Sequence, residues 1–141
     1  MSSTQSSSQS LPSHETLVAE VLSANQRLLE SIATGDWGTY AGLCEADLTC
    51  FEPEARGELV SGLGFHKFYF DLGGPPAKRH TTMCGPQVHV SGDMAVLCYV
   101  RLTQSLDAAG HPQTGRCEET RVWRRTAGQW RHVHFHRSAN A

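Results

Sequence analysis

The sequence has no apolar run approaching the roughly 20 residues that are needed to cross a membrane, and its N-terminus lacks the apolar core of a signal peptide. It also has no excess of basic residues: 12 Lys and Arg stand against 14 Asp and Glu, for a formal net charge of −2. Binding to nucleic acid depends on a surplus of cations that replaces the counterions of the phosphates. We therefore expect neither nucleic acid nor a membrane as a partner.

Paired cysteines are missing as well. The five cysteines are odd in number and show no short paired spacing; they are Cys44, Cys50, Cys84, Cys98 and Cys117. We therefore do not expect a secreted disulfide scaffold. We expect a reducing, cytoplasmic location. The sequence also contains no phosphate loop, dinucleotide fingerprint, nucleophile elbow or kinase signature. Because these motifs are absent, we expect no cofactor.

The 141 residues are enough for one domain with a hydrophobic core of its own. Residues 1–13 are rich in Ser and Gln, so we expect a disordered tail or the end of a linker. Apolar residues at helical spacing then predict a long helix from Ser13, an N-cap residue, to Gly35, which can take a left-handed conformation. Asp36 can cap a second, short helix.

A strand over 48–53 and a third helix from around Ser61 follow, and glycines and prolines at 73–76 break that helix. From His80 onward the apolar residues recur with period two, which is typical of strands. We predict four strands in this half, over residues 80–90, 94–106, 115–125 and 129–137. Helices followed by an antiparallel meander indicate an α+β fold.

The predicted strand 94–106 is apolar on both faces. One face carries Ala95, Leu97 and Tyr99, and the other carries Met94, Val96, Cys98, Val100, Leu102 and Leu106. Because an antiparallel sheet in a small domain usually keeps one face in water, something other than the chain's own helices should cover the second face. A second copy of the chain is the simplest cover, at an interface that comprises Val96, Cys98, Val100 and Leu102. The alternative is a strongly curled sheet that buries both faces by itself.

Strand alternation points Arg101, Arg121 and Arg137 toward the same side as the core residues. A buried guanidinium group needs a carboxylate, a carbonyl or a bound anion, and Glu119 is one internal candidate. A cavity lined by these arginines would favour a small carboxylate ligand. The alternative is that the arginines reach the rim of the sheet and are solvated.

The eight histidines raise the question of a metal site. Alternation places His132, His134 and His136 on one strand face with Trp130, but no acidic or cysteine ligand accompanies them there. A polar or interface-facing ladder is therefore favoured, and no metal is expected. His66, on the third helix, can project into the cavity of the arginines, although no partner that would orient it as a general base is identified.

Six segments carry a resemblance to a known family. They are Phe51–Ala55, Phe65–Phe70, His80–Thr82, Arg101–Gln104, Glu118–Trp123 and His134–Ser138. In this order and near this spacing they closely resemble the association, or hub, domain of calcium/calmodulin-dependent protein kinase II, over about residues 14–138. The resemblance implies a nuclear-transport-factor-2-like (NTF2-like) cone, with a long N-terminal helix packed in a strongly curved antiparallel sheet.

The resemblance also implies a function without kinase activity. In that family the domain assembles into stacked rings, usually of twelve or fourteen subunits, which hold kinase domains at the periphery. The family has a deep cavity, which small carboxylates occupy in some members, and the arginines of that cavity correspond to Arg101, Arg121 and Arg137, with His66 nearby. Glu119 and Tyr99 complete the set of cavity residues that we expect here.

The chain departs from the family pattern in three places. The segment 71–79 is short, rich in Gly and Pro and without the usual aromatic residue, and the segment 82–86 differs at a strand that helps to form contacts. No kinase domain or calmodulin-binding helix precedes residue 14, so we expect either an excised domain or a protein that consists of the hub alone. The competing interpretation is a small NTF2-like enzyme, of isomerase or dehydratase type, that uses the same cavity with His66, Glu119 or Tyr99 as its base.

Overall fold

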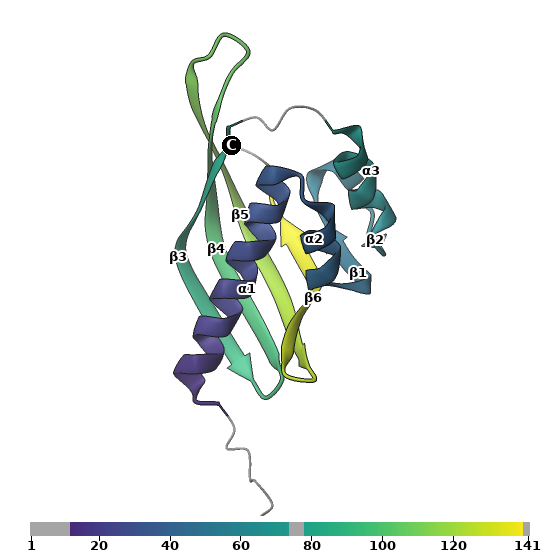
Figure 1. Ribbon diagram of the computed structural model, residues 1–141, viewed down its shortest axis with the longest axis vertical. Coiled ribbons are helices and arrows are strands. Elements are labelled where there is room, and N and C mark those ends of the chain that lie inside the picture. Colours follow the sequence, from purple (N-terminus) through teal and green to yellow (C-terminus); the bar gives the residue numbers. More distant parts are fainter. Residues whose placement is uncertain (1–11, 74–77, 140–141) are drawn as a thin grey trace, which may run out of the picture.

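The long N-terminal helix follows its predicted boundaries closely. The computed structural model describes residues 12–73 and 78–139 (Figure 1), so most of the expected tail lies outside the described residues. Helix α1 (His14–Thr34) begins after Ser13, whose hydroxyl accepts a hydrogen bond from the Thr16 amide at 3.1 Å, and it ends at Gly35 with a φ of 68°. Neither α1 nor any other helix in the described segments has the length and hydropathy of a membrane span.

The next elements lead into the edge of the sheet. Helix α2 (Trp37–Leu43), capped by Asp36, runs directly into strand β1 (Cys44–Phe51). A single 3-10 turn (Pro53–Ala55) and the two-residue strand β2 (Val60–Ser61) follow. Helix α3 (Gly64–Leu72) starts three residues later than expected, because Val60 and Ser61 pair with β1 and the chain then turns at Gly62, where φ is 86°.

The C-terminal half forms the predicted strands. They are β3 (His80–Ser91), β4 (Met94–Leu106), β5 (Pro112–Thr126) and β6 (Gln129–Arg137). Two-residue turns close the β3–β4 and β5–β6 hairpins, and in the second turn Ala127 and Gly128 both have positive φ, as such a hairpin requires. The β4–β5 hairpin projects beyond the other strands (Figure 1).

The six strands form one sheet in the order β2-β1-β6-β5-β4-β3. The α+β class is confirmed, but the sheet is mixed rather than wholly antiparallel, because β1 runs parallel to β6. The hairpins fix the direction of consecutive strands only. Strand β1 pairs with β6 although Thr49 and His134 are 85 residues apart in the sequence, so no tight turn forces the two strands into opposite directions.

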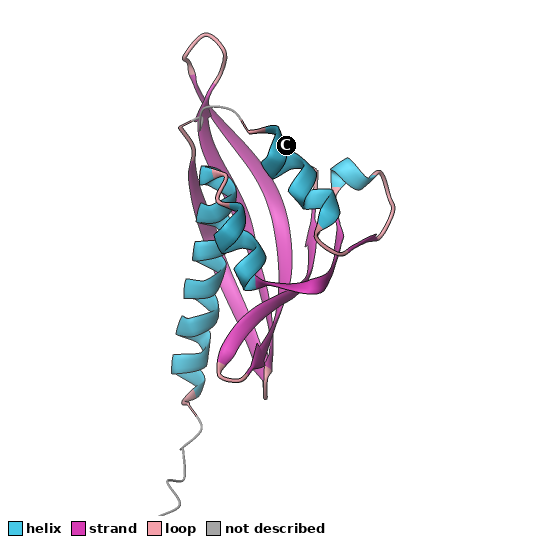
Figure 2. Cartoon of the chain, turned by 45° about the vertical axis from the view of Figure 1, so that its right-hand side comes forward, coloured by secondary structure: helices cyan, strands magenta, loops and turns pink. Residues whose placement is uncertain are grey.

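The helices lie on one face of the curved sheet, with α1 along its length (Figure 2). The core lies between them and consists of fully buried side chains such as Leu28 and Leu29 of α1, Leu97 of β4 and Trp123 of β5. No described helix covers the opposite, outer face (Figure 2). The fold therefore leaves one face of the sheet without a partner from the described parts of the chain.

The three alternating histidines of β6 do not share a face, so that expectation was wrong. A β-bulge at the β5–β6 pairing places Val122 opposite His134 and Trp123 opposite His132, which leaves Val133 as an extra residue. As a result His132 is fully buried in the core, whereas His134 is half-buried on the outer face with the exposed His136. Alternation predicts a shared face only where the ladder is unbroken.

Candidate functional site

A cavity of about 520 Å³ opens between the helices and the inner face of the sheet. Its lining comes from α1, α2, α3, the segment after β1 and the three strands β4, β5 and β6. It includes four of the six expected cavity residues, namely Arg101, Arg121, Arg137 and His66. Glu119 and Tyr99 lie directly behind the wall, where both are almost completely buried. The structure thus brings all six residues together, and Arg79 adds a fourth arginine to the lining.

The buried floor of the cavity is one continuous hydrogen-bond network. Arg121 Nη2 lies 2.6 Å from Glu119 Oε2, and both side chains are essentially inaccessible to solvent. The Tyr99 hydroxyl donates to Glu119 Oε1 at 2.7 Å and accepts from Arg121 Nε at 3.0 Å. Asn25 of α1 donates to the same hydroxyl at 3.0 Å and accepts from the indole of Trp123 at 3.2 Å. This network joins α1 to β4 and β5.

Electrostatics keep the central pair of this network ionised. Burial alone would raise the pKa of Glu119, but the charges of Arg121 and Arg101 outweigh it and hold that pKa below its usual value. Burial alone would likewise lower the pKa of Arg121, and Glu119 more than compensates, so this pKa is raised. Burial raises the pKa of Tyr99 to about 12, which leaves its hydroxyl neutral. The floor therefore holds a carboxylate and a guanidinium bridged by a neutral tyrosine.

His132 completes the surroundings of Arg121 as a neutral imidazole. Burial, and then the charge of Arg121, lower the pKa of His132 well below its usual value. Its Nε2 lies 3.4 Å from Arg121 Nη1 and accepts that hydrogen bond, which leaves the ring proton on Nδ1, 3.6 Å from the sulfur of Cys44. The guanidinium carbon of Arg121 also lies 4.4 Å from the centre of the Phe135 ring. Arg121 is thus occupied on every side by protein groups.

The other two arginines differ in how completely they are paired. Arg137 Nη2 contacts Glu52 at 3.4 Å and Glu54 more closely still. Arg101 reaches Glu119 only at 3.5 Å, and its Nε is a buried donor that has no hydrogen-bond partner among the described residues. Among the three expected arginines, Arg101 is therefore the one whose donors are least completely paired by the described residues.

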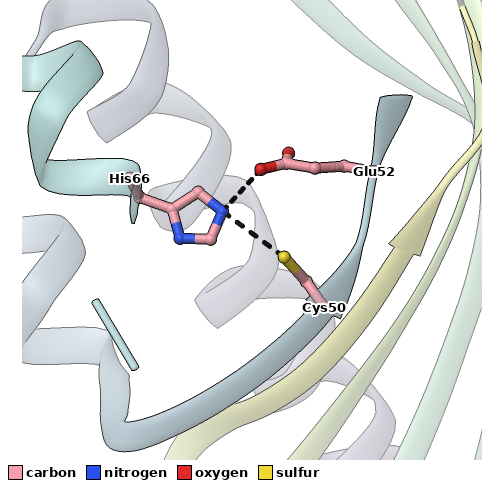
Figure 3. Close-up of side chains that lie close together, drawn as sticks. All are labelled: Cys50, Glu52 and His66. Carbon is pink, nitrogen blue, oxygen red and sulfur yellow. Dashed lines mark hydrogen bonds and ion pairs between the residues drawn. The ribbon is translucent and has the colours of Figure 1, made fainter. Parts of the chain in front are cut away.

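His66 has an orienting partner, Glu52, that the sequence does not predict. Its Nε2 lies 2.9 Å from Glu52 Oε1 and 3.6 Å from Cys50 Sγ (Figure 3). Burial would raise the pKa of Glu52, but the hydrogen bond from His66 and the charge of Arg137 outweigh it and the pKa is lowered. Burial, reinforced by Glu52, raises the pKa of the Cys50 thiol to about 12.

The sequence carried partial signals for these missed residues. Cys50 and Glu52 are two positions apart, so strand alternation points them to one side. Asn25 interrupts the apolar stripe of the first helix between Val21 and Leu28, and a polar residue at a buried position requires partners. Neither signal identifies the partner of the polar residue. His66, for example, lies on α3 and meets Cys50 and Glu52 only when α3 packs against β1.

The expected interface residues lie on the outer face of β4. Val96, Cys98, Val100 and Leu102 are each half-buried, and they alternate with the buried Ala95, Leu97 and Tyr99 of the inner face. Met94 and Leu106 extend this outer row at either end and are 39% and 51% exposed. The two faces of one strand thus belong to two different environments.

Replacing Glu119 by Gln tests the buried pair. The variant keeps the size of the side chain but leaves the Arg121 guanidinium buried without a counter-charge, so we expect a loss of about 3–5 kcal/mol in the free energy of unfolding at neutral pH. Urea denaturation of the two proteins measures this loss.

The effect of pH on this variant follows from the lowered pKa of Glu119. The carboxylate stabilises the fold above the pKa of an unfolded Glu, about 4.3, and that contribution disappears as pH falls through the lower folded pKa. The stability gap between the two proteins should therefore close in acid. Glu118→Gln, next to it but exposed, is the control, and an equal effect of the two substitutions at neutral pH would contradict a dominant buried pair.

Comparison with known proteins places these features in a family. The family model of the calcium/calmodulin dependent protein kinase II association domain matches residues 18–141. Over 125 residues the chain is 47% identical to the calcium/calmodulin-dependent protein kinase type II alpha chain of Drosophila melanogaster, a match that covers 86% of this chain and 24% of that protein. The chain thus spans about a quarter of the length of this relative.

Solved structures agree with the sequence match. The C. reinhardtii CaMKII hub homology domain superposes with a TM-score of 0.80 at 52% identity, over 86% of this chain and 97% of that one. The C. elegans CaMKII association domain gives a TM-score of 0.85 at 44% identity, over 89% of this chain and 97% of that chain. A putative NTF2-like dehydratase from Streptomyces avermitilis shares the fold. It is 24% identical, with a TM-score of 0.73 over 89% of this chain and 97% of that chain. This chain belongs to the calcium/calmodulin-dependent protein kinase II association domain family, and its α+β fold is of the NTF2-like type.

Proposed function

We propose that this chain is a non-catalytic oligomerisation domain whose copies close into a stacked ring. The observation that carries the proposal is the outer face of β4, which presents apolar side chains that no described helix covers. The names of the relatives, association domain and hub, support the same role. Copies of the domain that carry kinase subunits would be held together in such a ring at a high effective concentration.

The outer face has the composition of a protein interface. Val96, Val100 and Leu102 form its apolar centre, and Val122 of β5 lies opposite Val96. Polar groups surround this centre, among them Thr120. An apolar centre with a polar rim is the usual anatomy of contacts between subunits, and a second copy of the chain supplies a matching surface.

A charge at this centre should reduce the assembly. Val100→Asp places a carboxylate at a contact that becomes dry on association, so we expect a smaller particle. Light scattering coupled to size-exclusion chromatography, or native mass spectrometry, measures the mass. The wild-type chain should give a large multiple of the 15.5 kDa protomer at micromolar concentration.

Ala108→Asp is the matched control, since it puts the same charge in the exposed β4–β5 turn and should leave the mass unchanged. A wild-type protein that is monomeric, or a Val100→Asp variant with the wild-type mass, would contradict the proposed interface. Circular dichroism of the smaller species distinguishes dissociation from unfolding.

We further propose that the cavity binds a small carboxylate at Arg101. Glu119, Glu52 and Glu54 already neutralise much of the positive charge of Arg121 and Arg137. Arg101 lines the cavity and has one donor without a hydrogen-bond partner in the described segments, and a carboxylate of a few atoms would fit a cavity of about 520 Å³. A ligand that binds the folded state only would also stabilise it.

Acetate tests this proposal. Millimolar acetate should raise the melting temperature of the wild-type chain, and Arg101→Gln should weaken binding by about tenfold, the equivalent of one charge-assisted hydrogen bond. Calorimetric titration measures the affinity. Arg27→Gln, on the exposed surface of α1, controls for the loss of one positive charge. An unchanged melting temperature of the wild-type chain, or equal effects of the two variants, would contradict a site at Arg101.

One observation favours a second candidate function, a small isomerase or dehydratase. Glu52 lies 2.9 Å from Nε2 of His66 beside the cavity, and a carboxylate that orients an imidazole is one part of a general-base arrangement. This function predicts turnover of a small carbonyl or hydroxy substrate that His66→Ala abolishes and Arg27→Gln does not. A substrate screen in which the wild-type chain and His66→Ala behave alike would contradict the enzymatic function and leave oligomerisation as the proposed role.

A further inference from the structure

Cys50, Glu52 and His66 form a cluster that neither oligomerisation nor binding at Arg101 requires. Strand β1 and the residue after it supply Cys50 and Glu52, and the first turn of α3 supplies His66 (Figure 3). One potential ligand atom of each residue lies within 4.8 Å of the other two. Figure 3 shows the sulfur and one carboxylate oxygen on the same side of the imidazole, facing its Nε2.

The donor set suits zinc. Thiolate, imidazole and carboxylate are the three ligand types that zinc takes in proteins, and a site with three protein ligands keeps one position open. In a tetrahedral site with Zn–S of about 2.3 Å and Zn–N of about 2.0–2.1 Å, the sulfur and nitrogen lie about 3.6 Å apart. Sγ of Cys50 and Nε2 of His66 are 3.6 Å apart.

The carboxylate needs only a small adjustment. A zinc-bound oxygen at about 2.0–2.2 Å lies about 3.3–3.5 Å from a bound imidazole nitrogen. Oε1 of Glu52 is 2.9 Å from Nε2 of His66, so these two atoms must separate by a few tenths of an ångström. The same oxygen and the sulfur of Cys50 lie within 4.8 Å of each other, and both must meet the ion. Arg137 contacts the other oxygen of Glu52 at 3.4 Å and orients it, while Glu54 balances the arginine's charge.

A metal ion also resolves a competition within the cluster. Nε2 of His66 faces both Glu52 and Cys50, yet a ring nitrogen carries one proton at most and cannot make two full hydrogen bonds. An ion at this point bonds to all three atoms at once and displaces the proton of the thiol. We propose that Cys50, Glu52 and His66 form a zinc site whose fourth position opens to the cavity.

The cavity explains how the ion enters and what completes its coordination. Cys50 is completely buried, whereas Glu52 and His66 line the cavity and give the ion access from that side. The fourth ligand is then a water molecule or an oxygen of a bound carboxylate. The metal site does not depend on the oligomeric state, and its test is independent of the assembly measurements.

Cobalt provides a direct probe, because a thiolate bound to Co²⁺ gives a charge-transfer absorption in the near ultraviolet. The full chain, without a histidine tag and treated with a chelator, is titrated with Co²⁺ and then with Zn²⁺. We expect one Co²⁺ per chain, the thiolate absorption, and its loss when Zn²⁺ displaces the cobalt. Cys50→Ala should remove the absorption and weaken zinc binding by about a hundredfold or more, beyond the effect of losing an outer-shell group.

Cys117→Ala is the matched control, since Cys117 lines the same cavity but is not part of the cluster, and it should keep both signals. Glu52→Gln should keep the thiolate absorption and weaken binding, and Cys50→Ser provides a second test should Cys50→Ala fail to fold. A wild-type chain without the absorption, or an absorption that survives the loss of the Cys50 sulfur, would overturn the site. Loss of the absorption in Cys117→Ala would assign the metal to another thiol and overturn it equally.

Discussion

The buried pair of Arg121 and Glu119 is the interaction on which the rest of this structure depends. A guanidinium group with no access to solvent is tolerable only beside a carboxylate and further acceptors, and Glu119, Tyr99 and His132 supply them. Through Tyr99 and Asn25 the same network reaches α1, so the long helix is held against the sheet by polar contacts as well as by its apolar stripe. The cavity lies above a floor that is already satisfied, which leaves the groups on its walls available for other partners.

The two faces of strand β4 have different surroundings. Its inner face contributes Leu97 to the core and Arg101 to the cavity, while its outer face contributes Val96 and Val100 to a surface that no described helix covers. Alternation along a single strand therefore couples the two sides. The inner face of β4 would bind the ligand, and the outer face would form the proposed contact between copies. If the ligand prefers one assembly state, its binding would shift the assembly equilibrium toward that state.

The polar groups of the cavity fall into three sets with different chemistry. Arg121 is fully engaged by protein atoms and serves the structure. Arg101 has one donor without a partner among the residues that the structure describes, and it is the proposed site of a small anion. Cys50, Glu52 and His66 place one potential ligand atom each within 4.8 Å of the others, and they are the proposed zinc site. The NTF2-like fold places all three sets around one hollow, which is consistent with its use by both enzymes and assembly domains.

Much of this description follows from the sequence. Helical spacing and caps located α1, period-two patterns located β3–β6, and alternation pointed Arg101, Arg121 and Arg137 inward, because each of these signals is local in the chain. What depends on contacts between distant segments did not follow: the parallel pairing of β1 with β6, the bulge that separates His132 from His134, and the meeting of His66 with Glu52. Local residue patterns set the elements and, where the ladder is unbroken, their faces. Only the packing of α3 against β1 and the pairing of β1 with β6 decide which side chains from distant segments meet.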